Sequence, residues 1–276
     1  MKNLILRTLF GILYVGILAG VLLFLPHQLH IFTALSGCLM LHEFYANSLG
    51  ASFKAGRILA ALTMVLTCFA LWYIRKEAVG EEALALGLIP LLCLPITQIF
   101  SKERFEFGKF AYLCTGLLYI GVPVALLPIL IVRDGVPSGL ILLCFFILIW
   151  CSDVGAYCLG SLLGQKPGAK KLAPHISPKK SWWGVAGGVL LCTGGALALW
   201  GLQLLQMPWY HCLGLGVVIC LFATAGDLFE SLWKRHLGIK DSGNAIPGHG
   251  GWLDRLDSSL TAIPAATIYL ILFQLI

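Results

Sequence analysis

The chain has 276 residues, of which 59% are hydrophobic and only 12% are charged, and its mean hydropathy is +0.89. A soluble globular domain carries about 25% charged residues, so this composition excludes an ordinary soluble domain and predicts an integral membrane protein. The formal net charge of +6 is explained by basic loops at an anionic lipid surface, and no nucleic-acid partner is expected.

Apolar stretches close to the length of a membrane-spanning helix recur along most of the chain. They predict an all-α, polytopic integral membrane protein with about nine transmembrane helices. In chain order the stretches are 4–25, 29–49, 58–74, 83–100, 110–132, 139–163, 182–206, 209–225 and 256–276. The first follows Lys2 and Arg7, as a secretory signal would, but no small-residue cleavage site comes after it. We therefore expect it to remain as an uncleaved anchor.

The placement of lysine and arginine indicates how these helices are oriented, because cytoplasmic loops retain basic residues. With the N-terminus in the cytoplasm, all of the 19 basic residues except Arg75, Lys76 and Arg133 fall on the cytoplasmic side. Two polar loops, 164–181 and 227–258, are separated by an even number of spans. Both are therefore expected to face the cytoplasm, where nucleotides are found.

The domain organisation expected from the sequence is simple, because no internal repeat or low-complexity segment stands out. A single integral membrane domain should cover residues 1–276. Within it, residues 1–135 form N-terminal helices, and residues 136–276 form catalytic helices that carry both cytoplasmic loops.

The second loop concentrates charge in a chain that has little of it. Its polar residues form two groups at helical spacing, so each group would lie on one face of a helix. The first group is Asp227, Glu230, Ser231 and Lys234, and the second is Asp254, Asp257 and Ser258. Oxygen ligands of this kind suit Mg²⁺, which usually takes one or two carboxylates and completes its shell with water and substrate phosphates. Lys234, Arg235 and Arg255 are then candidates to hold phosphate charge.

An irregular, glycine-rich connection joins the two groups. Glycine lets the backbone approach a ligand closely and adopt positive φ, so that N–H groups can point at phosphate oxygens. A flexible loop tip with solvated charges explains the composition about equally well, although Pro247 and Trp252 favour an ordered segment. His249 is either a donor to phosphate or a structural residue, and Asp241 either acts in the site or holds Lys240 or a turn. The glycines in question are Gly248, Gly250 and Gly251.

The first loop supplies a second basic region, in which Ser177, Lys179 and Lys180 alternate hydroxyl and ammonium groups as a triphosphate site would require. The alternative is a positive loop that contacts lipid headgroups. Two acids within apolar helices, Asp153 and Glu43, are expected to be paired or functional, because an intramembrane charge is costly. Glu43 is the weaker case, since it falls near the expected membrane interface.

Several motifs in the chain occur together in one known family. They are SD at 152–153 with AY at 156–157, SPKKSW at 177–182, GDL at 226–228, SLWKR at 231–235, KDSG at 240–243 and PGHGGWLDRLDS at 247–258. This set resembles the signature of the phosphatidate cytidylyltransferases, also called CDP-diacylglycerol synthases. The resemblance covers roughly the C-terminal half, and upstream it extends only to general character and the Glu43-Phe44 pair. One departure is Trp183, where the family usually has glutamate, which leaves the role of that position open.

The resemblance implies transfer of a cytidylyl group from CTP to phosphatidic acid, which gives CDP-diacylglycerol and pyrophosphate. It implies Mg²⁺ as the cofactor, with a second, monovalent cation as an open alternative. The expected location is a cell membrane, the bacterial inner membrane. A homodimer is neither required nor excluded. The implied metal ligands are Asp227, Ser231, Asp254 and Asp257. The implied catalytic set is Asp227, Asp254, Asp257, Lys234, Arg235, Arg255, Asp241 and His249, and the nucleotide-binding set is Ser177, Lys179, Lys180, Gly248, Gly250 and Gly251.

Three other functions compete with this interpretation. A CTP-dependent lipid kinase, such as a polyprenol or phytol kinase, would share the membrane setting and the nucleotide. A secondary transporter would explain Asp153 and Glu43, but it would not explain the glycine-rich acidic loop. A CDP-alcohol phosphotransferase would need an aspartate array of the form DG-x-x-AR, which the sequence does not contain.

Overall fold

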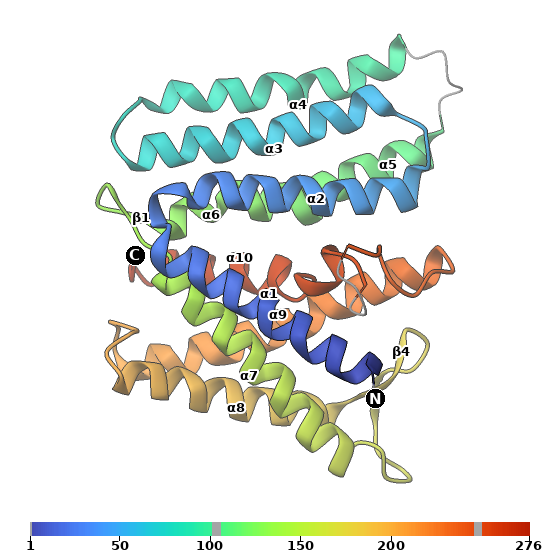
Figure 1. The fold of residues 1–276 in the computed structure, drawn as a ribbon, viewed down its shortest axis with the longest axis vertical. Coiled ribbons are helices and arrows are strands. Elements are labelled where there is room, and N and C mark those ends of the chain that lie inside the picture. Colours follow the sequence, from blue (N-terminus) through green and yellow to red (C-terminus); the bar gives the residue numbers. More distant parts are fainter. Residues whose placement is uncertain (1, 101–105, 246–249) are drawn as a thin grey trace. The chain divides into compact units, whose positions relative to one another are not determined.

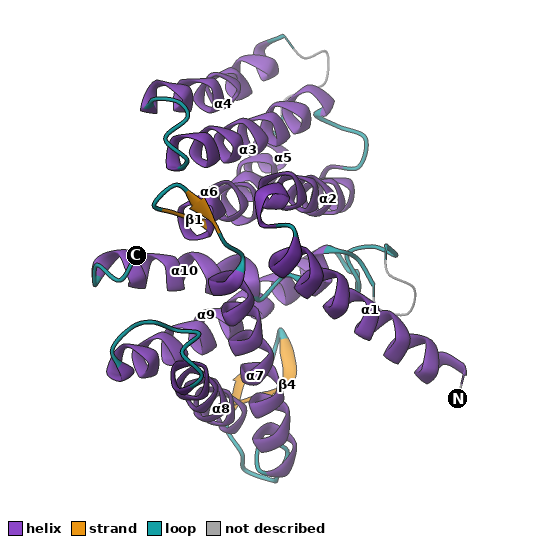
Figure 2. Cartoon of the chain, turned by 60° about the vertical axis from the view of Figure 1, so that its left-hand side comes forward, coloured by secondary structure: helices purple, strands orange, loops and turns teal. Residues whose placement is uncertain are grey.

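The computed structural model describes residues 2–100, 106–245 and 250–276. Helices dominate this part of the chain, and the strands within it form only two short pairs (Figure 2). The chain divides into two compact units. The first unit is Met1–Gly139 with Asp241–Arg255, and the second is Leu140–Lys240 with Leu256–Ile276.

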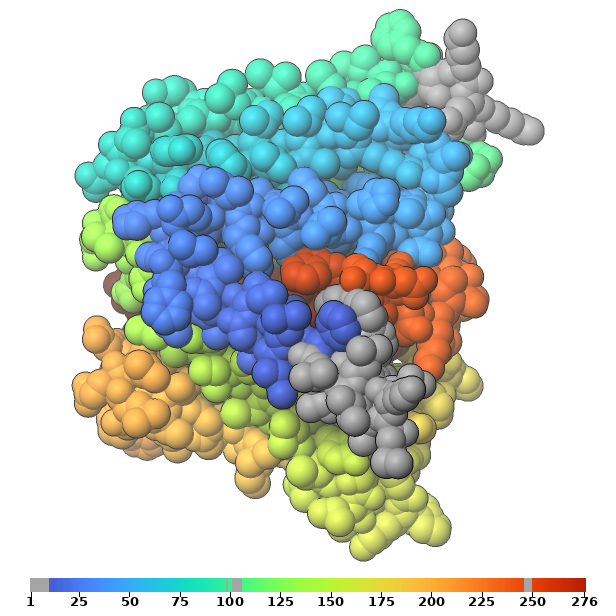
Figure 3. Space-filling model, viewed as in Figure 1, coloured from blue at the N-terminus to red at the C-terminus, as the bar shows by residue number. Residues whose placement is uncertain are grey.

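The first unit is built from a succession of apolar helices. They are α1 (Lys2–Phe24), α2 (Leu29–Leu49), α3 (Lys54–Arg75), α4 (Leu84–Ile99), α5 (Phe107–Gly116) and α6 (Val122–Ile131). The shorter elements are η1 (Pro26–Gln28), η2 (Glu81–Ala83), the π-helical turn η3 (Leu117–Gly121), β1 (Val132–Arg133), β2 (Val136–Pro137) and η4 (Leu253–Arg255). α3 packs against both α2 and α4, and the three helices lie side by side (Figures 1 and 3).

Two local features set the orientation of α2, the helix that carries Glu43. Pro26, which cannot continue the preceding helix, opens η1, and the axis turns by 99° between Phe10–Phe24 and Pro26–Leu49. At the other end of α2, Tyr45 is buried and its hydroxyl donates to the Leu113 carbonyl at 2.8 Å. These contacts hold the C-terminal half of α2 against α5.

The second unit consists of four helices and a hairpin. Its elements are α7 (Leu140–Leu162), β3 (Lys171–Ala173), β4 (Ser177–Ser181), α8 (Trp182–Gly201), α9 (Trp209–His236) and α10 (Ser259–Leu272). α7 and α8 pack backbone to backbone, because a Cβ on Gly155 would collide with the Gly187 carbonyl oxygen. Small residues permit the same close approach between helices in membranes.

The first polar loop contains regular structure that the sequence did not predict. β3 and β4 form an antiparallel pair, with Lys171 opposite Ser181 and Ala173 opposite Ser177. Ser181 then ends the strand and caps α8, since its hydroxyl accepts a hydrogen bond from the Gly184 N–H at 3.2 Å. The predicted polar loop 164–181 therefore contains a hairpin that leads directly into a helix.

Each of the nine predicted apolar stretches coincides with a helix, and one of them, Phe107–Ile131, is formed by α5, η3 and α6 together. Within the described residues, five helices are long and apolar enough to cross a membrane, or six if the bent α1–α2 pair counts as one span. α4 and α10 are shorter, with 16 and 14 residues. The structure is consistent with a multi-pass membrane protein, and the number of nine spans stays a prediction.

Candidate functional site

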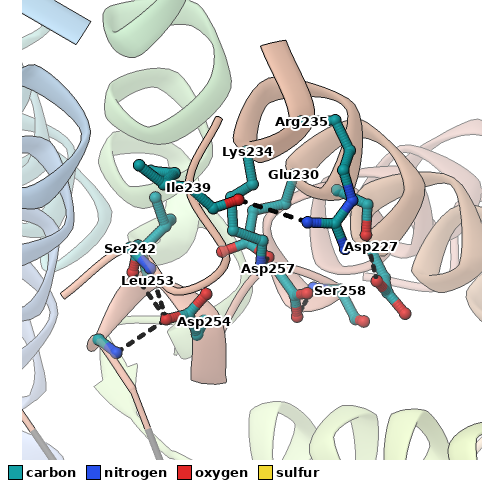
Figure 4. A network of polar contacts seen from close by, with 12 residues as sticks. Asp227, Glu230, Lys234, Arg235, Ile239, Ser242, Leu253, Asp254, Asp257 and Ser258 are labelled. Carbon is teal, nitrogen blue, oxygen red and sulfur yellow. Dashed lines mark hydrogen bonds and ion pairs between the residues drawn. The ribbon is translucent and has the colours of Figure 1, made fainter. Parts of the chain in front are cut away.

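The C-terminal end of α9 carries the first group of predicted site residues on one helical face. Ser231 donates its hydroxyl to Asp227 Oδ1 at 3.3 Å, and Lys234 forms an ion pair with Glu230. Both contacts join residues four apart, as the sequence spacing predicts. α9 therefore extends beyond its apolar stretch and presents an acidic face (Figure 4).

Glu230 is the most deeply buried charged residue of this face. Its side chain is 0% exposed, and the Lys234 side chain that neutralises it is 14% exposed. A carboxylate in such a position is costly unless it is paired and hydrogen-bonded. Asp257 also interacts with Glu230, so the Glu230–Lys234 pair borders Asp257. The sequence places Glu230 on this face but assigns no role to it.

Asp257 lies beside α9, just before α10 begins. A Cβ on Gly226 would lie 2.7 Å from the Asp257 carbonyl oxygen, so glycine at position 226 allows this close approach. The Asp257 carboxylate accepts a hydrogen bond from the Ser258 N–H at 2.6 Å. Burial, followed by the negative charge of Asp227, raises the pKa of Asp257 to about 6. Two carboxylates thus repel each other at this site.

β4 brings one cation to the pair. Lys180 Nζ lies 2.6 Å from Asp227 Oδ2, and this ion pair is partly exposed. Because successive side chains of a strand point to opposite faces, Lys179 points away from the side that holds Lys180. Lys179 is exposed, and Ser177 lies on its face of the strand. Of the three predicted nucleotide-binding residues on this strand, the structure brings only Lys180 to the carboxylates.

α7 contributes a further acid to the same unit. Asp153 interacts electrostatically with Asp257, Asp227 and Lys180. The prediction that this intramembrane acid is paired or functional is consistent with that position. Across the described ranges, no three His, Cys, Asp or Glu side chains are close enough together to form a metal site by themselves.

Asp254 lies in the first unit, where it organises the glycine-rich segment. Its Oδ2 atom accepts hydrogen bonds from the Ser242 N–H and the Gly251 N–H, both at 2.8 Å. It also lies 3.0 Å from the Ser242 hydroxyl, whose single proton is shared with Glu43 Oε2 at 2.9 Å. The dashed lines that meet at Asp254 in Figure 4 mark these bonds. One carboxylate oxygen of this predicted metal ligand therefore stabilises the backbone at Ser242 and Gly251.

The described glycines of the segment have steric roles there. Gly250 has φ +87°, which favours glycine, and a Cβ on it would lie 2.7 Å from Asp254 Oδ2. Asp241 lies on the other side of Gly250, with its Cβ 3.4 Å from the same position. Gly251 is enclosed by Ser242 and Glu43. The predicted phosphate contacts of Gly248 and His249 lie outside the described residues.

The two predicted phosphate-binding arginines are both exposed. Arg235, near the end of α9, donates to the Ile239 carbonyl at 3.4 Å. Arg255 lies in η4 of the first unit, and its carbonyl accepts a hydrogen bond from the Tyr14 hydroxyl at 3.4 Å. Within the described part of the chain, neither guanidinium forms an ion pair with a carboxylate, and both remain accessible at the surface.

Comparison with known proteins gives a family and several named relatives. Residues 5–273 match the cytidylyltransferase family. A phosphatidate cytidylyltransferase of Bacillus subtilis (strain 168) is 34% identical over 199 residues, which cover 72% of this chain and 72% of the relative. One of Staphylococcus epidermidis (strain ATCC 12228 / FDA PCI 1200) is 36% identical over 187 residues, which cover 67% and 68%.

A third relative, the phosphatidate cytidylyltransferase of Staphylococcus aureus (strain COL), is 36% identical over 174 residues, which cover 63% of this chain and 64% of the relative. The family match spans nearly the whole chain and includes both units, so it is not limited to the polar segments that carry the motifs. The resemblance seen in the sequence is confirmed, and the chain belongs to the cytidylyltransferase family.

Proposed function

We propose that this chain is a phosphatidate cytidylyltransferase, which transfers CMP from CTP to phosphatidic acid and releases pyrophosphate. The names of its relatives support this activity. The structural observation that carries it is the pairing of Asp227 with Lys180, next to Asp257, at the end of α9. This arrangement offers carboxylate oxygens to a cation and an ammonium group to a phosphate.

The donor atoms of the second unit fit a magnesium ion. Asp227 and Asp257 supply carboxylate oxygens, and Ser231 supplies a hydroxyl oxygen. All are hard ligands of the kind that Mg²⁺ prefers. Burial and then the charge of Asp227 raise the pKa of Asp257, and a divalent cation would relieve the repulsion between the two acids. Asp254 is proposed as a further ligand on the strength of the signature alone.

The reaction needs positioning and charge neutralisation more than covalent chemistry. An oxygen of the phosphatidic acid phosphate attacks the α-phosphorus of CTP, and the bond from that phosphorus to the bridging oxygen breaks as pyrophosphate leaves. When bound, Mg²⁺ supplies polarisation of the α-phosphate and stabilises the leaving group. No general base is required, because a phosphate monoester with a second pKa of about 6 is largely dianionic at pH 7.

Cationic side chains of this chain would hold the remaining phosphate charge. Lys180 can exchange its contact with Asp227 for a phosphate oxygen, whereas Lys234 has its own acid partner in Glu230. Arg235 and Arg255 are exposed and complete the proposed set, with Asp241 and His249 as further candidates. Ser177 and Lys179 remain proposed CTP contacts.

The proposed location is a multi-pass position in a bacterial inner membrane, with the N-terminus and the site in the cytoplasm. The distribution of basic residues supports this orientation. CTP is a cytoplasmic nucleotide, which requires the same side. A second, monovalent cation and a homodimer also remain proposals.

A membrane assay with CTP labelled at either the α- or the γ-phosphate tests the activity. With phosphatidic acid and Mg²⁺, the α-label should enter the lipid and the γ-label should appear in pyrophosphate. Transfer of the γ-label to lipid would instead identify a CTP-dependent lipid kinase, and absence of nucleotide turnover would favour a transporter. Removal of Mg²⁺ and the Asp257→Ala variant should each abolish the α-label transfer.

A further inference from the structure

One face of α2 is hydrogen-bonded to the segment 241–255, of which residues 241–245 and 250–255 are described. Ser36, Glu43 and Asn47 are seven and four residues apart, so they lie on one side of the helix. The Trp252 indole donates to the Ser36 hydroxyl at 2.7 Å, and the Asn47 amide donates to the Ser242 carbonyl at 2.6 Å. A polar stripe in this apolar helix is therefore occupied by the segment that carries the family signature.

Glu43 is the centre of this stripe. Its Oε1 atom accepts a hydrogen bond from the Trp252 N–H at 2.8 Å. Its Oε2 atom accepts from the Leu253 N–H at 2.8 Å and from the Ser242 hydroxyl at 2.9 Å. Both oxygens are thus committed to the segment, which is how a carboxylate in an apolar helix can be tolerated.

Two glycines of the segment are explained by this carboxylate. A Cβ on Gly243 would lie 2.7 Å from Glu43 Oε1, and a Cβ on Gly251 would lie 2.5 Å from Glu43 Oε2. Both distances are below 3.0 Å, so a side chain at either position would displace the Glu43 carboxylate. Glycine at these positions lets the backbone reach Glu43, a role that differs from the phosphate contact expected for Gly251.

The chemistry of the donors requires an acceptor-only group at position 43. The partners of the carboxylate are two backbone N–H groups, which can only donate, and the Ser242 hydroxyl, whose single proton is shared with Asp254. A glutamine would turn its NH₂ group toward the Trp252 N–H or the Leu253 N–H and leave one of them without an acceptor. An aspartate would end about 1.5 Å short of the donors, which is one carbon–carbon bond.

We infer that Glu43 is a positioning residue, which fixes the conformation of residues 241–245 and 250–255 and thereby orients Asp254. Ser242 links the two acids, because its hydroxyl lies 2.9 Å from Glu43 Oε2 and 3.0 Å from Asp254 Oδ2. Its N–H also donates to Asp254. The consequence for catalysis rests on the proposed function, whereas the consequence for the conformation of the segment does not.

Hydrogen exchange of the purified protein in lipid nanodiscs tests the conformational part without any substrate. In Glu43→Gln, the amides of Trp252 and Leu253 should exchange about tenfold faster or more, because one of these two donors loses its acceptor. His42→Ala changes the exposed neighbour on the same helix and should leave the exchange at the wild-type rate. Wild-type protection in Glu43→Gln would overturn the inference.

Asn47→Ala and Ser242→Ala keep the test decisive if Glu43→Gln does not fold. Each removes part of the fastening and leaves the Glu43 bonds to Trp252 and Leu253 in place. Each should therefore speed exchange at Ser242 and its neighbours by a smaller factor, about threefold. Unchanged exchange in both variants would contradict a fastened segment.

Kinetics separate positioning from a general loss of fold. Glu43→Gln should raise the Mg²⁺ concentration for half-maximal CDP-diacylglycerol formation about tenfold. Loss of a residue that orients a metal ligand typically weakens metal binding by this factor. A purely structural role would lower the amount of folded enzyme without moving that concentration, and this result would overturn the inference. If the wild type forms no CDP-diacylglycerol, the proposed function fails, and the exchange experiment still decides the role of Glu43.

Discussion

The carboxylates clustered around the end of α9 and those that hold the segment 241–255 against α2 are stabilised in opposite ways. Asp227 and Glu230 face ammonium groups, and Asp257 faces another acid. Glu43 and Asp254 instead accept hydrogen bonds from backbone N–H groups and one hydroxyl. Both regions are acidic, and in the first the charge of Asp227 adds to burial in raising the pKa of Asp257.

This difference separates acids that can bind a ligand from acids that stabilise the conformation of the chain. Backbone N–H groups satisfy a carboxylate with fixed dipoles that add no net charge, so such an acid stabilises a loop conformation. Acids opposed by lysine or by each other keep exchangeable partners, which a phosphate or a metal ion can replace. We therefore expect substitutions in the two regions to affect activity and stability in different proportions.

Asp227→Asn should lower activity far more than it lowers stability. We expect CDP-diacylglycerol formation to fall about 1000-fold, on the order of 4 kcal/mol in the barrier, because a proposed metal ligand is lost. Stability should change by less than about 1 kcal/mol, since losing the partly exposed pair with Lys180 is offset by relief of the repulsion from Asp257. Thermal unfolding alongside the kinetic assay measures both quantities.

Asp254→Ala is the matching change in the other region. It should abolish product formation, but here the exchange protection of Ser242 and Gly251 should be lost as well, because both N–H groups donate to Asp254. If Asp227→Asn sped up the exchange of the Ser242 and Gly251 amides as much as Asp254→Ala does, for the same loss of activity, the contrast between the two regions would be wrong. Asp254→Asn, which keeps an acceptor oxygen, should lose activity with less effect on exchange.

Glu230→Gln tests the buried pair in the first region. Removing one member of a buried ion pair leaves an unneutralised charge, so the free energy of unfolding should fall by about 3 kcal/mol. A second change, Lys234→Met, should recover most of that loss. Glu106→Gln is the control, because its pair with Lys109 is exposed and should contribute less than about 0.5 kcal/mol. Equal effects at Glu230 and Glu106 would contradict the burial of the pair.

Lys180→Ala and Lys179→Ala compare the two faces of β4. Lys180 contacts Asp227, so its loss should lower kcat/KM for CTP about thirtyfold, or ~2 kcal/mol for a charge-assisted contact. Lys179 is exposed on the opposite face, and its loss should raise the KM for CTP no more than about threefold. A larger effect at Lys179 would place the nucleotide on the other side of the strand.

The sequence predicted the features that depend on local spacing and composition. The apolar stretches correspond to helices, and the i, i+4 spacing of Asp227 with Ser231 predicted a contact that the structure contains. The family resemblance was carried by contiguous motifs and is confirmed. These signals need no knowledge of which distant segments meet.

Contacts between distant segments were not predictable in the same way. Glu43 and Trp252 are 209 residues apart, and nothing in their local sequence identifies them as partners. The β3–β4 hairpin was missed because its lysines and Pro178 lack the alternating apolar pattern of a half-buried strand. Burial of Glu230 was likewise hidden, since spacing shows that it shares a helix face with Lys234 but not what covers that face.

The smallest predicted effect concerns pH, and it again distinguishes the two regions. Asp257 has a pKa of about 6 in the folded protein against an ordinary value of 3.8, so between these values the folded state holds a proton that the unfolded state has released. The metal-free protein should therefore lose stability as pH rises from about 4 to 6. Mg²⁺ must displace that proton, so its binding should strengthen about tenfold between pH 5 and pH 7.

Thermal unfolding without nucleotide or lipid, in a titration of Mg²⁺ at pH 5, 6 and 7, measures this effect without the titration of substrate phosphates. Asp257→Asn has no proton to release and should remove the pH dependence along with most of the binding. His42→Ala, outside both regions, should keep the wild-type profile. If the wild type bound Mg²⁺ equally well at pH 5 and pH 7, Asp257 would not contact the ion. The acids around the end of α9 would then stabilise the fold, as those that hold the segment 241–255 do.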